Sequence, residues 1–260
     1  MKKFLGFALM LLPLTGFSWG VLGHRIVGEV AESHLSSKAR SKVKQLLGNE
    51  SLAMSSNWAD FIKSDSAYNY ISSWHYDNFP AGLTQNEFYK YLAADTTDGA
   101  YRAFKSLKSE LKKKDLPHQK QVMYLKLLIH IVGDMHQPLH MGRKEDLGGN
   151  RIRVMWFNDN VNLHQVWDER LVNFQQLSYT EYEKAINHTT PAQRKQWGNA
   201  PVEEWLHESY ECAQKIYAGV SPEQKLSYRY NFDHITMLNE QLLKGGVRLA
   251  AVLNEIYGSR

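Results

Sequence analysis

The segment from His130 to His140, HIVGDMHQPLH, contains the densest group of side chains that could bind a metal ion. His130 and Asp134 are four residues apart, so a helix would place both on one face. Pro138 would end that helix and allow His140 to turn back toward the pair. Imidazole and carboxylate groups together suit Zn²⁺. The segment therefore indicates a candidate zinc site.

A second pair of the same kind follows at His164 and Asp168, again four residues apart. One isolated pair is more often a buried hydrogen-bonded pair or a surface charge than a metal site. Two such pairs together with His140 reverse that balance. Upstream, Asp60 and His75 add a carboxylate and an imidazole, each beside aromatic residues that would keep a site partly dry.

The first residues of the chain have the pattern of a secretory signal peptide. Lys2 and Lys3 precede an apolar run over residues 4–14, and small residues follow up to Ser18. The run is shorter than the roughly 20 residues that span a bilayer. We therefore expect a signal peptide at 1–18, a mature domain at 19–260 and an exported protein, either secreted or periplasmic. A retained membrane anchor is the alternative.

Cleavage after Ser18 would make Trp19 the first residue of the mature chain. A metal could displace the proton of its free α-amino group near neutral pH, because the ordinary pKa of that group is about 7.7–8.0. The Trp19 carbonyl oxygen would complete a chelate ring, and His24 follows five residues later. A Trp followed by a His is by itself an ordinary fragment, but in this position it predicts an N-terminal metal site.

Most of the chain is predicted to be helical, because apolar residues recur three and four positions apart. The clearest patterns cover residues 27–35, 37–47, 87–113, 120–135, 203–217 and 237–257. Thr84 with Glu87 and Ser221 with Gln224 fit capping boxes that would begin two helices. The exception is 151–157, where polar and apolar residues alternate before a turn-like stretch, as in a hairpin arm. We expect a mainly α single domain with a short β-hairpin.

Composition sets few limits on function. The net charge of +4 and pI of about 8.9 are compatible with a polyanionic substrate but do not establish one. The lysine-rich run at 108–114 is interpreted as a solvated helix end. Cys212 is the single cysteine, so an intrachain disulfide is excluded and stability must come from core packing or bound metal. No second apolar stretch has membrane length, and we expect a monomer without stable membrane association.

Nine of these residues resemble, in order and spacing, the zinc ligands of the S1/P1 nuclease family: Trp19, His24, Asp60, His75, His130, Asp134, His140, His164 and Asp168. The resemblance covers residues 19–168, and the remainder fits as a helical completion. It implies a helical domain of the phospholipase C/P1 nuclease type. It also implies hydrolysis of phosphodiester bonds in RNA and single-stranded DNA, and of 3′-mononucleotides, leaving 5′-phosphates.

The resemblance further implies three Zn²⁺ ions. The first would be held by Asp60, His75, His130 and Asp134, and the second by His140, His164 and Asp168. The third would be held by Trp19 and His24, with Asp134 bridging it to the first. Paired metals about 3.5–4 Å apart lower the pKa of bound water toward ~7, so the implied nucleophile is a zinc-bridged hydroxide at the Asp134 pair.

Residues near the ligands are candidates for contact with substrate. Lys63 falls where the family has a basic side chain on the scissile phosphate, so with Asp60 and Asp134 it belongs to the expected catalytic group; a solvent-facing lysine is the alternative. Tyr76 falls where the family stacks an aromatic ring on a nucleobase, with core packing as the alternative. Asp77, Asn78 and Asn150 are candidate base contacts. His136 is a candidate for supporting a ligand.

Two other interpretations stay open. A tri-zinc phospholipase C acting on phospholipid head groups would have similar architecture, but its first His is further from the Trp and its final ligand is Glu where this chain has Asp168. A zinc-stabilised binding protein without catalysis is the other, and a complete ligand set with Lys63 and Tyr76 argues against it, since a structural zinc needs only four ligands.

Overall fold

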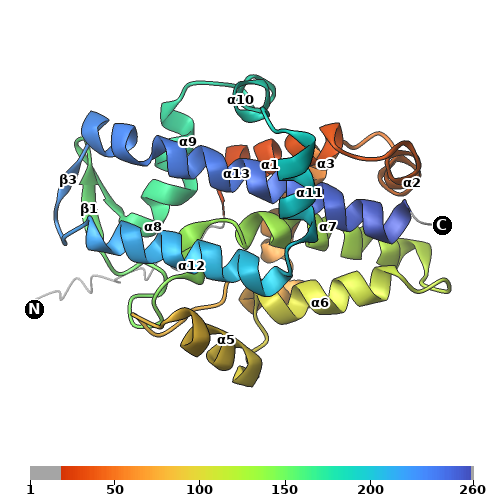
Figure 1. The fold of residues 1–260 in the computed structure, drawn as a ribbon, viewed down its shortest axis with the longest axis horizontal. Helices are drawn as coiled ribbons and strands as arrows, with labels where there is room; N and C mark the ends of the chain where they lie inside the picture. Colours follow the sequence, from red (N-terminus) through yellow and green to blue (C-terminus); the bar gives the residue numbers. More distant parts are fainter. Residues whose placement is uncertain (1–18, 259–260) are drawn as a thin grey trace, which may run out of the picture.

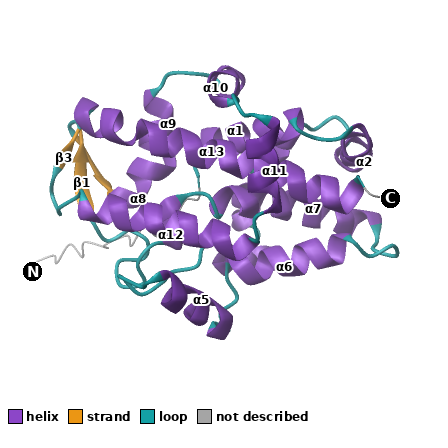
Figure 2. Cartoon of the chain, in the orientation of Figure 1, coloured by secondary structure: helices purple, strands orange, loops and turns teal. Residues whose placement is uncertain are grey.

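The computed structural model describes residues 19–258, so the predicted signal peptide lies outside the described residues. Helices dominate this part of the chain (Figures 1 and 2), which confirms the predicted fold class. The first half contains α1 Val21–Ser33, α2 Ser37–Leu47, α3 Leu52–Ser55, α4 Trp58–Phe61, η1 Ile62–Ser64, η2 Ser66–His75, α5 Gln85–Ala94, α6 Ala100–Leu111, α7 His118–Asp134 and η3 Pro138–Met141. The second half contains α8 Leu163–Gln165, η4 Val166–Arg170, α9 Leu171–Phe174, α10 Tyr179–Ile186, α11 Pro191–Asn199, α12 Val202–Ala218 and α13 Tyr228–Tyr257.

Two local predictions were wrong. The pattern at 87–113 is two helices, α5 and α6, because Asp95 forms a turn by accepting from the backbone N–H and hydroxyl of Thr97, and α6 starts anew after Gly99. Ser221 and Gln224 close a turn rather than cap a helix. Glu223 in that turn has a φ of +62°, which a helix cannot contain. The Thr84–Glu87 capping box is present as predicted.

The predicted hairpin is present and belongs to a small sheet. Strands β1 Arg153–Trp156 and β2 Asp159–Asn162 pair antiparallel. The two-residue strand β3 Lys225–Leu226, which sequence analysis missed, adds in parallel to the other edge of β1. A two-residue strand is too short to show an alternating pattern in the sequence. Its pairing with β1 depends on the turn at Ser221 that precedes it. The sheet lies at one end of the helical body (Figure 1).

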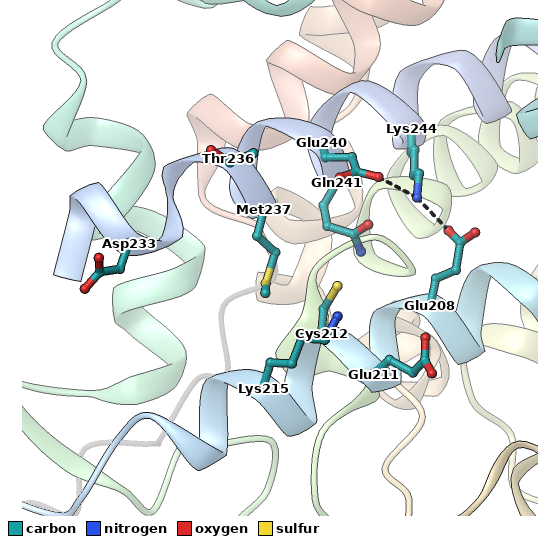
Figure 3. Close-up of a pocket in the computed structure, with 10 residues that line it drawn as sticks. All are labelled: Glu208, Glu211, Cys212, Lys215, Asp233, Thr236, Met237, Glu240, Gln241 and Lys244. Carbon is teal, nitrogen blue, oxygen red and sulfur yellow. Dashed lines mark hydrogen bonds and ion pairs between the residues drawn. The ribbon is translucent and has the colours of Figure 1, made fainter.

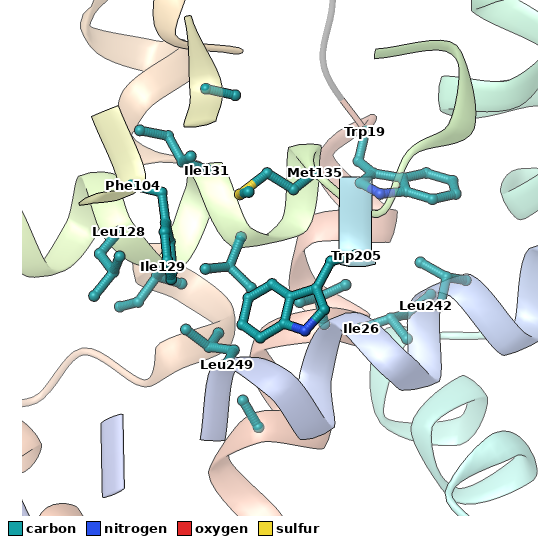
Figure 4. Close-up of a cluster of buried hydrophobic side chains, with 14 of the residues drawn as sticks. Trp19, Ile26, Phe104, Leu128, Ile129, Ile131, Met135, Trp205, Leu242 and Leu249 are labelled. Atoms are coloured by element: carbon teal, nitrogen blue, oxygen red, sulfur yellow. The ribbon is translucent and has the colours of Figure 1, made fainter. Parts of the chain in front are cut away.

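One apolar core joins α1, α7, α12 and α13. Figure 4 shows Trp19 and Trp205 in this core together with Phe104 from α6 and Leu249 from α13. Both indole side chains are almost fully buried. Burial of apolar surface stabilises by roughly 25 cal/mol per Å², so large aromatic side chains contribute heavily to holding these helices together.

The last helix, α13, is the longest and crosses the molecule (Figure 1). Its thirty residues span about 45 Å at 1.5 Å each. It packs along α1 and also contacts α7, so it holds in place the two helices that carry candidate ligands. Within residues 19–258, no helix is long and apolar enough to cross a membrane.

Candidate metal centre

Three groups of His and Asp side chains, two of which share His130, meet where α1, α4, α7 and the segment around α8 converge. Donor atoms in each group lie within 4.8 Å of one another, and each group could hold a metal ion. The groups are His24 with Asp60 and His130, His75 with His130 and Asp134, and His140 with His164 and Asp168. Eight of the nine predicted ligands are therefore brought together by the fold.

Asp134 stands between two sets of histidines. Its Oδ2 atom lies 3.0 Å from His75 Nδ1 and 3.1 Å from His130 Nε2, while its Oδ1 atom lies 3.4 Å from His24 Nε2. A carboxylate that bridges two ions needs its oxygens directed at separate ligand sets in this way. His24 also groups with Asp60 and His130. The resemblance assigns His24 to the third site, whereas in the structure it lies close to ligands of the first site as well.

The spacing in the His75 group fits a tetrahedral ion. Zn–N bonds of about 2.0–2.1 Å imply about 3.3 Å between neighbouring ligand atoms. His75 Nδ1 and His130 Nε2 are 3.0 Å apart, and both lie 3.0–3.1 Å from Asp134 Oδ2. Three atoms in a compact triangle cannot all be joined by linear hydrogen bonds, whereas one cation can bind all three. His75 Nε2 and Asp134 Oδ1 are buried and make no hydrogen bond with residues 19–258.

Backbone carbonyl groups fix the orientation of three candidate ligand rings. The Nδ1 atoms of His130, His140 and His164 lie 2.6–2.7 Å from the carbonyl oxygens of Ser56, His75 and Gly148, respectively. A carbonyl oxygen only accepts, so each Nδ1 carries the proton and each Nε2 presents its lone pair to the centre. These oxygens come from chain segments that sequence analysis did not connect with the ligands.

The group of His140, His164 and Asp168 has one further support that sequence analysis missed. Gln137 is fully buried, donates its side-chain amide to Asp168 Oδ1 and accepts from the backbone N–H of Leu139. Its position inside the segment 130–140 was the one feature of the sequence that could have indicated this role. Asp168 lies in the π-turn η4, and its Oδ2 atom is 3.1 Å from His164 Nε2. Such turns are frequent at functional sites.

Two glycines permit the close approaches that form the centre. A Cβ atom on Gly133 would lie 2.7 Å from His24 Nδ1, so only glycine lets α1 place His24 directly against α7. Gly148 has a φ of +64°, and a Cβ there would lie 2.3 Å from the Leu139 carbonyl oxygen. The turn at Gly148 supplies the carbonyl that orients His164.

The electrostatics put these groups in the protonation states that metal binding requires. Burial opposes charge on Asp134, but His130 and His140 outweigh it and hold its pKa well below the usual range. Burial lowers the pKa of His75 to about 4 and also lowers the pKa of His24. At neutral pH the carboxylate is ionised and these two imidazoles are neutral, as metal ligands must be.

Trp19 is placed beside the centre by the backbone. The amide of Gly20, at the start of α1, donates to the Asp168 carbonyl oxygen at 2.9 Å. The Trp19 side chain is fully buried and contacts Gly23, one residue before His24. Residue 19 is therefore fixed next to a candidate ligand segment.

The predicted substrate contacts differ in exposure. Lys63 Nζ lies 2.6 Å from Asp60 Oδ1, with about a quarter of its side chain exposed. Tyr76 is exposed, which excludes the core alternative. Asn78 is partly buried, and Asn150 bonds with the Leu147 carbonyl and Asn162.

Asp77 is buried, and its carboxylate accepts from the backbone N–H of Tyr101 at 2.7 Å in the first turn of α6. Burial raises the pKa of Asp77 to about 7. This carboxylate positions the start of α6, and its contact with a base stays a prediction.

His136 does not face the centre as expected. Its Nδ1 atom bonds the Val132 carbonyl, and its Nε2 atom lies 3.1 Å from the Arg248 guanidinium on α13. Burial and the Arg248 charge hold the pKa of His136 well below its usual range. His136 lies in the turn after α7, which ends at Asp134, and its side chain is directed at Arg248 on α13.

A separate hollow of about 400 Å³ lies between α12 and α13 and contains none of the predicted site residues. Figure 3 shows Lys244 between Glu208 and Glu240 at its edge, at 3.3 and 2.8 Å. The half-buried Cys212 also lines it, and burial raises the pKa of its thiol to about 11, so it is not a reactive thiolate at neutral pH.

Comparison with known proteins agrees with this geometry. The chain is 30% identical over 271 residues to Endonuclease 4 of Arabidopsis thaliana, which covers 93% of this chain and 90% of the relative. It is 29% identical over 267 residues to Nuclease P1 of Penicillium citrinum, covering 93% and 98% of the two chains. Nuclease PA3 of Penicillium sp matches to the same extent. Residues 19–258 match the S1/P1 nuclease family, and the chain therefore belongs to that family of nuclease hydrolases.

Proposed function

We propose that this protein is an exported zinc-dependent nuclease that hydrolyses RNA and single-stranded DNA to 5′-phosphorylated products and also releases phosphate from 3′-mononucleotides. The observation that carries the proposal is the position of Asp134, whose two oxygens face different histidine sets in a fully buried centre. Names of relatives such as Nuclease P1 and Endonuclease 4 support the nucleic-acid substrate.

The donor set favours three Zn²⁺ ions. Asp60, His75, His130 and Asp134 would hold one, and His140, His164 and Asp168 a second. Trp19 and His24 would complete a third with Asp134. Bound there, zinc would supply Lewis-acid charge at the phosphate and lower the pKa of a bound water toward ~7.

The surrounding residues have separate tasks. Asp134 keeps two ligand sets at a fixed separation, and Asp60 holds Lys63 at 2.6 Å. From there the Lys63 ammonium can stabilise negative charge that develops on the phosphate oxygens. Tyr76 offers an exposed ring on which any base can stack, which favours unpaired strands over a closed duplex. Asp77, Asn78 and Asn150 are the proposed contacts to the base edge.

The proposed mature N-terminus has independent support, since the family match begins at Trp19. Export, with cleavage after Ser18, would then provide the α-amino group as a ligand. An exported, monomeric enzyme is the form that we expect to act.

Hydrolysis by the purified mature protein tests the proposal. We expect release of 5′-phosphorylated products from RNA and single-stranded DNA, and of phosphate from a 3′-mononucleotide. Activity should disappear on chelation and return with Zn²⁺. Hydrolysis of phosphatidylcholine alone would refute the nuclease assignment in favour of a phospholipase C.

A further inference from the structure

Exposed aromatic side chains gather on the segment that joins two candidate ligands. Five large aromatic residues are exposed in the chain between 19 and 258. Three of them, Phe61, Tyr70 and Tyr76, lie within the stretch bounded by Asp60 and the residue after His75. Exposed rings that line a candidate site are a feature of proteins that bind single strands.

The 3₁₀-helix η2 ends at His75, so Tyr70 lies within it and Tyr76 is the first residue after it. A 3₁₀-helix has three residues per turn, so side chains three apart eclipse one another. Tyr68, Ile71 and Trp74 form the inner face, where Ile71 is buried and the other two pack against the core. Tyr70 lies off this inner face and is 50% exposed, and Tyr76, in extended backbone just after η2, is 45% exposed. From Tyr70 to the end of η2 the chain rises about 10 Å at about 2.0 Å per residue, so the two tyrosines are on the order of 10 Å apart.

The Tyr70 ring is held in position before any ligand arrives. It stacks at 6.4 Å on Tyr68 and meets Trp74 edge-on at 5.5 Å. Tyr68 in turn meets Trp58 edge-on at 5.6 Å, and Trp74 Nε1 donates to Asp98 at 3.0 Å. Four aromatic side chains therefore buttress one another, and a preorganised ring loses little freedom on binding.

The charge near this segment is mixed. Residues 66–76 contain no acidic side chain and Lys63 precedes η2, while Asp65 caps η2 and Asp98 accepts from Trp74. A separation on the order of 10 Å corresponds to about three stacked nucleotides at about 3.4 Å each. A strand with one base on Tyr76 would therefore bring a base several nucleotides away onto Tyr70.

We propose that Tyr70 is a second base-stacking platform, which binds a nucleobase several nucleotides from the scissile phosphate of a single-stranded substrate. This inference rests on the proposed nuclease function and deepens it. Tyr70 would serve oligonucleotides alone, because a 3′-mononucleotide at the metal centre does not reach that far.

Steady-state kinetics on two substrates test the proposal. With an oligonucleotide of about ten residues, Tyr70→Ala should raise KM by about 5- to 100-fold, the loss of one base stack, with little change in kcat. With a 3′-mononucleotide, both constants should stay at the wild-type values. Tyr70→Trp should restore the KM for the oligonucleotide, since a larger ring also stacks.

Tyr228→Ala is the matched control, because Tyr228 is a 71% exposed tyrosine at the start of α13, outside the segment between Asp60 and Tyr76. It should leave both substrates unaffected. An unchanged KM of Tyr70→Ala for the oligonucleotide would overturn the proposal. So would an equal loss on both substrates, which would mean that Tyr70 acts through the metal centre.

Binding of a phosphorothioate oligonucleotide, followed by fluorescence anisotropy, separates this inference from the nuclease proposal because it needs no turnover. Its Kd should rise in Tyr70→Ala by the same factor as KM. A wild-type protein that binds the strand through Tyr70 but cleaves no nucleic acid would refute the nuclease function and keep the platform. Cleavage of both substrates with an unchanged Kd in Tyr70→Ala would refute the platform alone.

Discussion

At the scale of single residues, the rings of His130, His140 and His164 share one arrangement. Each gives its Nδ1 proton to a backbone carbonyl and directs Nε2 at the centre. Such partners set the tautomer and orientation of a metal-binding ring. The Asp168 carboxylate receives equivalent support from a side chain, the amide of Gln137.

Gln137→Leu should weaken metal binding by the His140, His164 and Asp168 group by about 10- to 100-fold, as is typical when a residue that orients a ligand is lost. The change keeps the volume but removes the donor to Asp168 and the acceptor for Leu139 N–H. Zinc titration against a competing chelator measures the effect. Gln119→Leu, on the exposed start of α7, is the control. Equal affinities for the two variants would show that Gln137 does not support the ligand.

Acid should destabilise the metal-free protein through its buried imidazoles. The folded-state pKa of His75, about 4, lies below the ordinary 6.5, so the unfolded chain binds more protons between these values. The free energy of unfolding therefore falls as the pH drops from about 6.5 to 4, by roughly 3 kcal/mol for this group. His24 acts in the same direction, whereas His130 opposes it because Asp134 and Asp60 outweigh burial and raise its pKa.

Calorimetry of chelated protein between pH 7 and 4 tests this expectation. His75→Gln should show a smaller fall in melting temperature than the wild type. An equal fall in both proteins would contradict the assignment to His75. In the zinc-loaded protein, zinc content should decrease over the same range, because protons compete for the same nitrogen atoms. Full zinc content well below pH 5 would contradict that second expectation.

At the scale of elements, the centre depends on how closely α1 approaches α7. His24 on α1 and His130 on α7 stack with ring centroids 3.9 Å apart. The contact is possible because Gly133 presents no side chain to His24. Helix α13 packs against both α1 and α7, and its Arg248 guanidinium bonds His136 just after α7 and Glu208 on α12.

Gly133→Ala should displace His24, because its Cβ would lie 2.7 Å from the ring nitrogen. We expect the loss of one bound zinc and a fall in the free energy of unfolding of about 1–3 kcal/mol, the usual cost of overpacking. Metal analysis and denaturant unfolding measure the two effects. Gly219→Ala is the control, since a Cβ there meets only ordinary contacts at 3.7 Å. Full zinc content in Gly133→Ala would refute the close-approach argument.

At the scale of the whole molecule, the proposed third zinc connects maturation with activity. Trp19 is buried, and Gly20 N–H is bonded to the Asp168 carbonyl, so the beginning of the described chain is fixed against the centre. A signal peptide that remained attached would replace the α-amine with an amide nitrogen, which is a poor ligand. Removal of the signal peptide would then complete the active site.

A protein with two extra residues before Trp19 should bind fewer zinc ions than the mature protein and lose most of its activity. Metal analysis and hydrolysis of a 3′-mononucleotide measure both. A protein that begins at Trp19 is the control. Three zincs and full activity in the extended protein would show that the Trp19 amine is not a ligand.

The sequence alone determined the parts of this protein that depend on local spacing. Helical periodicity places His130 with Asp134 and His164 with Asp168, and both pairs are close in the structure. Alternation at 151–157 predicted the hairpin, and the apolar pattern gave α2 its limits. These features are set within one or two turns of chain, so the residues that decide them are neighbours in sequence.

Tertiary structure alone decided which distant segments meet. The carbonyls of Ser56 and His75 lie 74 and 65 residues from the rings that they orient, and no local pattern connects them. The break at Asp95, the pairing of β3 and the inward turn of His136 toward Arg248 likewise follow from side-chain bonding and packing across elements. The fold also made η2 a 3₁₀-helix, whose period of three residues places Tyr68, Ile71 and Trp74 on one inner face and leaves Tyr70 exposed.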